Sequence, residues 1–203
     1  QPMEALVFGV LLTIGGLLYL TFVVNILSGL VISAIVITYL FVYTPLKQKS
    51  SLCTVAGAIP GALPPVVGWV AARGTLNIEA WVLFAILFLW QLPHSLSIAC
   101  IYRDDYAQAG FRLLPVIHPD GQSTRRQIVN NCVALLVVGL LPTLIGLTGI
   151  IYFFASLILG GVFLGFGINL AISRSMVAAK RLLYASLVYL PMMFLMMALD
   201  KIT

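Results

Sequence analysis

The distribution of apolar residues constrains the fold of this chain more than any other feature of its sequence. A helix needs about 20 mostly apolar residues to cross a bilayer, and seven stretches meet that requirement. They cover residues 5–24, 26–44, 52–72, 80–102, 128–148, 150–172 and 182–199. None of them alternates apolar and polar residues as the strands of a membrane barrel do. The sequence therefore predicts an all-α, polytopic transmembrane helical bundle, with residues 1–203 forming a single domain.

The composition excludes most other classes of protein. Hydrophobic residues make up 62% of the 203 residues and charged residues only 8%, whereas a soluble domain is about 45–50% apolar and about 25% charged. A soluble fold of this size could not bury so much apolar surface. The eleven Lys and Arg residues form no dense basic run, so nothing indicates nucleic-acid binding.

The positions of the basic residues predict the orientation of the bundle. Nine of the eleven fall on the side of the predicted bundle that carries Gln1, and only Arg73 and Lys201 fall on the other. Loops rich in Lys and Arg face the cytoplasm. The longest polar stretch, roughly 103–127, lies on this basic side. We expect it to form an ordered cytoplasmic cap that carries the function, since long loops between packed helices are usually functional or disordered.

Two adjacent carboxylates, Asp104 and Asp105, stand at the inner end of the fourth predicted span. Such a pair suits a hard cation such as Mg²⁺, which binds one or two carboxylates together with phosphate oxygens. The alternative is that both acids begin a short interfacial helix and pair with Arg103 or Arg112. Position alone favours neither interpretation, because acids inside a membrane are usually functional and interfacial acids often are not.

Lys47 and Lys49 follow the second predicted span. The simpler interpretation makes them anchors at the cytoplasmic interface. The functional interpretation makes them partners of Arg103 and Arg112 in neutralising a phosphate group held by a metal.

Two spans carry residues that are unusual within a membrane. The stretch from Gly57 to Trp69 holds three prolines, which predict a broken helix, and Gly57 and Gly61 permit close packing beside a cavity. The sequence Trp90-Gln-Leu-Pro-His94 places an imidazole in the inner half of the fourth span. His94 lies about three helical turns before Asp104, so it could line the same chamber at a deeper level. The alternative is that a neighbouring hydroxyl or carbonyl binds it.

Taken together, these motifs resemble those of the UbiA superfamily of intramembrane aromatic prenyltransferases, and in particular its haem-modifying branch. The resemblance covers essentially the whole chain, and four blocks carry it in order. They are Tyr43-Thr-Pro-Leu-Lys47, the proline-rich stretch from Gly57 to Trp69, Trp90-Gln-Leu-Pro-His94, and Asp104-Asp105-Tyr106-Ala-Gln-Ala-Gly110-Phe-Arg-Leu-Leu-Pro115-Val.

The resemblance implies a bundle of nine transmembrane helices around a central cavity, with a cap of cytoplasmic loops. Two aspartate-rich motifs of such a protein hold Mg²⁺ against the diphosphate of a prenyl donor, and Asp104 and Asp105 match the second motif. The first, N-x-x-x-D-x-x-x-D, should precede the first span and is absent from this sequence. We therefore expect the seven spans to be the third to ninth helices of a longer protein.

The same resemblance implies a Mg²⁺-dependent transfer of a farnesyl group from farnesyl diphosphate to a vinyl group of haem B. Asp104 and Asp105 would be the metal ligands, and Lys47 and Tyr106 would also act in catalysis. Candidate substrate contacts are Tyr43, Lys49, Trp90, His94, Arg103 and Arg112. A bacterial or mitochondrial inner membrane would hold the protein, with the catalytic loops facing cytoplasm or matrix. Later haem-modifying or oxidase-assembly proteins are the expected protein partners.

Two other functions remain open at this point. A prenyltransferase of the same fold could act on a quinone precursor or on chlorophyllide, although the motifs around His94 and Gly110 favour haem. A small-solute transporter should show matched broken helices in two repeated halves, and the proline-broken span has no convincing counterpart in this sequence.

Overall fold

The computed structural model of the protein describes residues 1–118 and 120–202. Within them, seven helical segments are long and apolar enough to cross a membrane, which confirms the predicted number of spans and the all-α class. These segments are Pro2–Val24, Ile26–Leu46, Cys53–Arg73, Ile78–Ile101, Gln122–Leu144, Ile150–Ser173 and Met176–Leu199.

Several of these segments consist of more than one helix. The helices are α1 (Pro2–Tyr19), α2 (Ile26–Ile37), α3 (Thr44–Leu46), α4 (Cys53–Ala62), α5 (Pro64–Arg73), α6 (Ile78–Ile101), α7 (Arg103–Gln108), α8 (Leu114–Ile117), α9 (Gln122–Val138), α10 (Leu141–Leu144), α11 (Ile150–Ser173) and α12 (Met176–Leu199). Two π-helical turns, Leu20–Val24 and Thr38–Tyr43, extend α1 and α2. The third span is broken at Leu63, between α4 and α5, as its prolines predicted.

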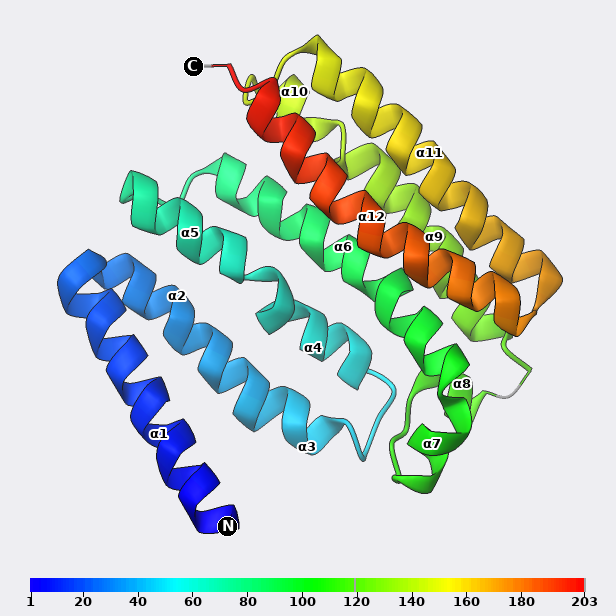
Figure 1. Ribbon diagram of the computed structural model, residues 1–203, viewed down its shortest axis with the longest axis horizontal. Coiled ribbons are helices and arrows are strands. Elements are labelled where there is room, and N and C mark those ends of the chain that lie inside the picture. The colour runs from blue at the N-terminus through cyan, green and yellow to red at the C-terminus, as the bar shows by residue number, and fades with distance from the viewer. Residues whose placement is uncertain (119, 203) are drawn as a thin grey trace.

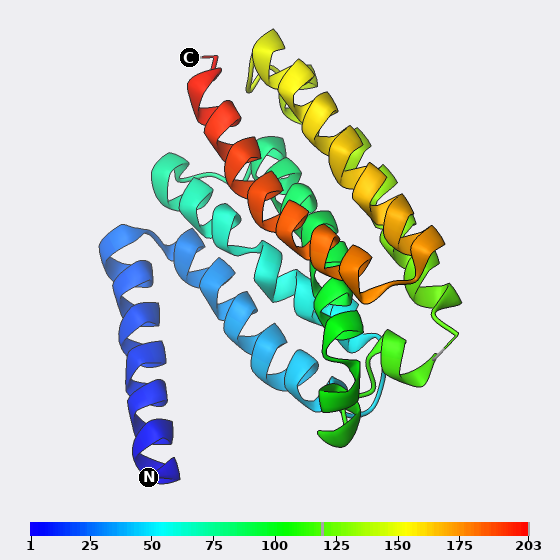
Figure 2. The same cartoon turned by 45° about the vertical axis from the view of Figure 1, so that its right-hand side comes forward.

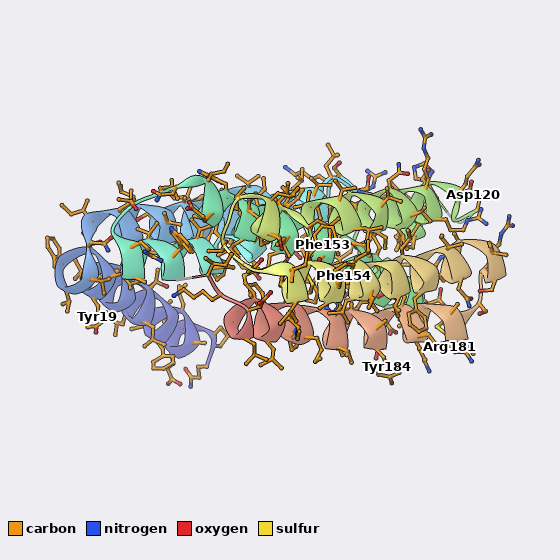
Figure 3. All side chains as sticks on the ribbon, turned by 90° about the horizontal axis from the view of Figure 1, so that it is seen from above. Tyr19, Asp120, Phe153, Phe154, Arg181 and Tyr184 are labelled. Carbon is orange, nitrogen blue, oxygen red and sulfur yellow. The ribbon has the colours of Figure 1, made fainter. Side chains whose placement is uncertain are left out.

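The long helices run roughly side by side, and their connections lie at two ends of the molecule (Figure 1). The start of α1, the short helices α3, α7 and α8, and the turn between α11 and α12 lie at one end, which we call the cap end. The α1–α2 turn and the end of α12 lie at the other (Figures 1 and 2). Figure 3 likewise shows Asp120 and Arg181 at one end and Tyr19 at the opposite end. Successive connections therefore lie at opposite ends of the bundle, as the predicted series of membrane spans requires.

The main core lies between α6, α9, α11 and α12. Its largest fully buried side chains include Ile86, Tyr152, Phe163 and Leu182. A smaller cluster centred on Val66 joins α2 and α5 to α6. Helix α1 contributes no buried residue, and its main packing partners are α2 and the turn that connects them. Helix α6 thus belongs to the main core and also packs against α4 and α5, which connect it to α2 and α1 (Figure 1).

Two spans begin about six residues earlier than their apolar stretches predicted. Helix α9 begins at Gln122 instead of residue 128, and α12 begins at Met176 instead of residue 182. The added turns of α9 are polar, and those of α12 end in Lys180 and Arg181. Lys, Arg and Ala are good helix formers, so both helices continue beyond the predicted spans toward the cap end. Ser175 fixes the start of α12, because its hydroxyl accepts a hydrogen bond of 3.2 Å from the Ala178 N–H.

Candidate functional site

The end of the second span carries two neighbouring tyrosines, whose ring planes are tilted by 34°. Pro45 cannot donate a backbone hydrogen bond, and the preceding turn, Thr38–Tyr43, is widened into a π-helix, with the Thr44 hydroxyl donating to the Tyr39 carbonyl at 2.9 Å. The rings of Tyr39 and Tyr43 lie 5.2 Å apart. Such wide turns are frequent at functional sites, and this one places two aromatic faces next to α4.

Helix α4 can lie close to these tyrosines because Gly57 has no side chain. A Cβ atom at Gly57 would fall 2.8 Å from the Cδ2 atom of Tyr43, well inside van der Waals contact. One turn later, Gly61 similarly admits the side-chain amide of Gln91 from α6, whose Nε2 donates to the Ala58 carbonyl at 2.8 Å. The glycine pair therefore permits close packing, as expected, and Gly57 also lines the cavity beside this broken span.

Helix α6 divides the Trp90-to-His94 motif between two faces. Gln91, Ser95 and Ile98 follow a spacing of three and four residues and face α4, because residues so spaced share one helix face. Trp90 and His94 face α12 instead. The Trp90 indole donates to the Ser186 carbonyl at 2.9 Å, His94 Nδ1 lies 2.8 Å from the Ser186 hydroxyl, and the two rings stack at 4.8 Å.

The cap closes over α4 and α6 through a short helix and a loop. The rings of Tyr106 in α7 and Phe111 lie 5.7 Å apart, and the Phe111 N–H donates to the Tyr106 carbonyl at 2.9 Å. The ammonium of Lys47, beyond α3, lies 5.4 Å from the centre of the Phe111 ring, within range of a cation–π interaction. The Arg112 N–H donates to the Lys47 carbonyl at 3.2 Å, so the backbone of the cap is attached to the end of the second span.

These elements enclose a cavity of about 290 Å³ just inside the cap end. One cationic group, Lys47, lines it. The aromatic and polar lining residues are Tyr39, Tyr43, Thr54, Gln91, Ser95, Tyr106 and Phe111, with Ala58, Ile98, Ala99 and Leu113 as apolar lining. The cavity therefore offers a single positive charge, several aromatic faces and a lining of mixed polar and apolar side chains.

Asp104 and Asp105 lie in the first turn of α7, the helix that carries Tyr106. Both are exposed, and neither forms an ion pair with Arg103, Arg112 or any other described residue. They begin a short helix, as the interfacial interpretation predicted, and the helix dipole favours acidic residues in a first turn. The ion pair with Arg103 or Arg112 that this interpretation also predicted is absent. Among the described residues, no three His, Cys, Asp or Glu side chains come together as a metal site.

The structure brings together only some of the predicted site residues. Tyr43, Lys47 and Tyr106 line the cavity, with the aspartates on the adjoining turn of α7. Lys49 and Arg112 are exposed and do not line it. Arg103 lines a different cavity. Trp90 and His94 do not line the cavity either, so the expectation that His94 shares a chamber with Asp104 is corrected: α6 turns it toward Ser186.

Five of the aromatic and polar lining residues were absent from the predicted site: Tyr39, Thr54, Gln91, Ser95 and Phe111. Gln91 and Ser95 are polar residues spaced by four within an apolar span, a pattern that indicates one polar helix face. That signal was available in the sequence. The position of Phe111 against Lys47 depends on how the cap folds back, and no local pattern predicts it.

The pairing of His94 with Ser186 predicts a measurable coupling between α6 and α12. We expect His94→Ala and Ser186→Ala each to lower stability, and the double variant to lose about 0.6 kcal/mol less than the sum, the typical size of a hydrogen bond between membrane helices. Unfolding in mixed micelles measures this double-mutant cycle. His94→Ala combined with Ser156→Ala is the control, because Ser156 binds the Gly139 carbonyl elsewhere in the bundle and its effect should be additive. Additive losses in the first cycle would contradict the pairing.

The fold and the cavity together define a class of protein. A bundle of membrane-spanning helices lines a cavity with a lysine, several aromatic rings and several polar side chains, and two carboxylates lie on the short helix that carries Tyr106. These are the features of an integral membrane protein with a binding cavity between its helices.

Comparison with known sequences then identifies the family. The sequence profile of the UbiA prenyltransferase family matches residues 1–197, and the chain belongs to this family. The predictions of a UbiA-type fold and of prenyltransferase as the enzyme class are confirmed. No solved structure gives a significant match.

Individual relatives carry a more specific name. The chain is 49% identical to a protein of Solibacter usitatus over 198 residues, covering 98% of this chain and 68% of the relative. It is 47% identical to one of Koribacter versatilis, covering 98% and 66%, and 37% identical to one of Sorangium cellulosum, covering 96% and 69%. All three are named protoheme IX farnesyltransferase. The chain thus spans about two thirds of the length of these relatives.

Proposed function

We propose that the protein transfers the farnesyl group of farnesyl diphosphate to a vinyl group of haem B, releasing diphosphate and forming haem O. The names of the relatives support the acceptor and the donor. The observation in this chain that supports the chemistry is the position of Lys47, held over Phe111 at the rim of a cavity that Tyr39, Tyr43 and Tyr106 also line.

Lys47 acts on the leaving group in this proposal. Breaking the allylic C–O bond leaves its electron pair on the diphosphate, so negative charge develops there and positive charge on the prenyl carbon. A fixed ammonium group stabilises the diphosphate in a site shielded from bulk water. The stacking of Lys47 on Phe111 and the attachment of its backbone to Arg112 limit the movement that the ammonium must make during the reaction.

The aromatic rings act on the opposite charge. The faces of Tyr39, Tyr43 and Tyr106 attract the developing allylic cation by cation–π interaction. The apolar lining, which includes Ile98 and Leu113, contacts the prenyl chain. A vinyl carbon of haem then supplies the electrons of the new C–C bond, and water adds to the resulting cation and loses a proton, which gives a hydroxyethylfarnesyl group.

Asp104 and Asp105 fit a role as Mg²⁺ ligands. They offer exposed carboxylate oxygens without an ion-pair partner among the described residues, and Mg²⁺ binds proteins through one or two carboxylates while retaining waters or phosphate oxygens. The ion would supply Lewis-acid stabilisation of the diphosphate when bound. Its remaining ligands would come from the substrate and from the first aspartate-rich motif, which the resemblance places before residue 1.

The orientation and the location are also proposals. Nine of the eleven basic residues, all except Arg73 and Lys201, belong to segments at the cap end. We therefore propose that this end faces the cytoplasm of a bacterium or, in a eukaryote, the mitochondrial matrix. The inner membrane would then present the cavity to a water-soluble diphosphate. Association with later haem-modifying or oxidase-assembly proteins stays a prediction.

One experiment tests the proposed reaction. The full-length protein is incubated in lipid nanodiscs with haem B, farnesyl diphosphate and Mg²⁺, and the products are analysed by mass spectrometry. We expect haem O, and none after chelation of the metal. Parallel incubations offer a quinone precursor or chlorophyllide as acceptor. Prenylation of one of these without any haem O would assign the chain to another branch of the family and refute the proposed acceptor.

The close approach of Gly57 to Tyr43 leads to a further prediction. Gly57→Ala forces the Tyr43 ring to move, because the added Cβ would lie 2.8 Å from it. We expect turnover to fall by roughly tenfold to a hundredfold, as small displacements of positioning groups cost that much. Gly68→Ala in α5 is the matched control, since open space surrounds that glycine. Equal activity of the two variants would show that the position of Tyr43 is not important for the reaction.

A further inference from the structure

A second cavity, of about 500 Å³, lies at the cap end on the other side of α6. It shares no lining residue with the cavity at Lys47. Three arginines from separate segments line it: Arg103 from the start of α7, Arg125 from α9 and Arg174 from the turn between α11 and α12. The proposed transfer reaction uses none of this cavity.

The charges around this cavity are unbalanced. Asp120 is the only acidic side chain that lines it, and His118 is the only other titratable one besides Cys100 and the arginines. No arginine forms an ion pair with a described residue. Arg125 is held in place, because its guanidinium donates to the carbonyls of Gly121 at 3.0 Å, Asp120 at 3.3 Å and Ala171 at 3.5 Å. The side chains of Arg103 and Arg174 form no hydrogen bond with the described residues and can bind a ligand.

An unpartnered hydroxyl faces the same cavity. Thr124 lines it and is only 2% exposed, yet its Oγ1 atom has no hydrogen-bond partner among the described residues. A buried polar atom without a partner is costly, so a ligand oxygen there would stabilise the protein. Thr124 lies in the first turn of α9, which begins after Gly121 without a side-chain cap. The first N–H groups of a helix favour an anion.

The deeper part of the cavity is apolar, with Ile128, Leu170 and Ala179 in its lining. We propose that this cavity binds a phosphate group, carried by an anionic phospholipid or free in solution. Arginine guanidinium groups bind phosphate through paired hydrogen bonds, and basic pockets between membrane helices bind anionic headgroups. The inference does not rest on the proposed prenyl transfer, since the two cavities share no lining residue. Arg103, which the resemblance made a candidate substrate contact, lines only this second cavity.

Arg174 provides a variant that removes the charge without threatening the fold. Its backbone is left-handed, with φ of 53°, and it is the only described residue other than glycine with positive φ. Glycine is favoured in this conformation at the end of a helix, so Arg174→Gly should fold at least as well as the natural protein. Thr124→Val removes the buried hydroxyl at nearly constant volume. Arg126→Ala is the matched control, because Arg126 is exposed on α9, does not line the cavity and carries the same charge.

The experiment measures the melting temperature of the full-length protein in phosphatidylcholine nanodiscs. One series adds increasing fractions of phosphatidylglycerol to the bilayer, and the other adds inorganic phosphate to the solution. We expect a saturable rise in melting temperature in at least one series, since a ligand of the folded state stabilises it. Arg174→Gly and Thr124→Val should weaken the apparent affinity by about tenfold, and Arg126→Ala should leave it unchanged.

The outcomes separate the two sources of phosphate. A rise with phosphatidylglycerol alone assigns the site to a lipid headgroup, and a rise with inorganic phosphate as well assigns it to phosphate groups in general. The proposal is overturned if neither probe stabilises the natural protein. It is equally overturned if Arg174→Gly responds as the natural protein does, or if Arg126→Ala weakens the response as much as Arg174→Gly, because the attraction would then be diffuse.

Discussion

Replacement of Asp104 by alanine in the full-length enzyme should lower Mg²⁺-dependent turnover by about 10²–10³-fold, the usual cost of losing a group that stabilises transition-state charge. The carboxylate is exposed on the first turn of α7, beside the cavity that Tyr106 lines, and has no ion-pair partner among the described residues. Its removal should therefore weaken Mg²⁺ binding more than it lowers the stability of the fold. Initial rates measured over a range of Mg²⁺ concentrations test this, because loss of a ligand raises the concentration of Mg²⁺ that is needed.

Gln108→Ala is the control for this experiment. Gln108 is an exposed residue of the same short helix and does not line the cavity, so the variant tests any general effect of disturbing α7. Its rate should stay within about twofold of the natural enzyme, as surface substitutions usually have small effects. Unchanged turnover and unchanged Mg²⁺ dependence in Asp104→Ala would remove Asp104 from the metal site.

The second large effect is expected at Lys47. Lys47→Gln should lower turnover by about 10²-fold, because the uncharged amide cannot neutralise the leaving diphosphate in a site of low dielectric constant. Lys49 lies two residues later, is exposed and does not line the cavity. Since Lys49→Gln removes the same charge from the same segment, its effect on turnover should be much smaller.

Steady-state rates of both lysine variants, at saturating and limiting farnesyl diphosphate, distinguish two roles. A fall in kcat for Lys47→Gln indicates stabilisation of charge in the transition state, whereas a rise in KM alone indicates uniform binding of the donor. Equal losses of turnover in Lys47→Gln and Lys49→Gln would mean that the total positive charge of this segment matters, and not the position of either lysine. The position of Lys47 over Phe111 would then have no special role.

The fold was largely predictable because the bilayer imposes a simple rule. Each span must supply about 20 apolar residues and satisfy its own backbone hydrogen bonds, so a hydropathy pattern predicts number, type and order of the helices. The break near Leu63 was also predictable, since Pro60, Pro64 and Pro65 remove backbone donors. The starts of α9 and α12 were not, because polar turns such as the one containing Arg125 and Arg126 extend a helix without any apolar signal.

The site was predictable only in part. The motif around Lys47 and the one around Asp104 were singled out by charge in a chain with few charges, and the structure places Lys47 and Tyr106 on one cavity with the aspartates beside it. Arg103 was singled out on the same grounds, and His94 as a polar residue within an apolar span, but neither lines this cavity. A helix turns by about 100° per residue, so Gln91 and His94, three residues apart, differ by only about 60° around α6. Their spacing therefore did not separate them, yet Gln91 binds α4 and His94 binds α12.

By itself, the sequence determined that this chain carries seven apolar helical spans, because hydropathy is a property of each segment alone. Its resemblance to UbiA-type prenyltransferases likewise rested on local motifs. Which side chains meet was decided only by the tertiary structure. The stacking of Lys47 on Phe111, the approach of Tyr43 to Gly57 and the gathering of Arg103, Arg125 and Arg174 around a second cavity join segments far apart in the chain. Such contacts depend on how helices pack and rotate against one another, and no local pattern of residues contains that information.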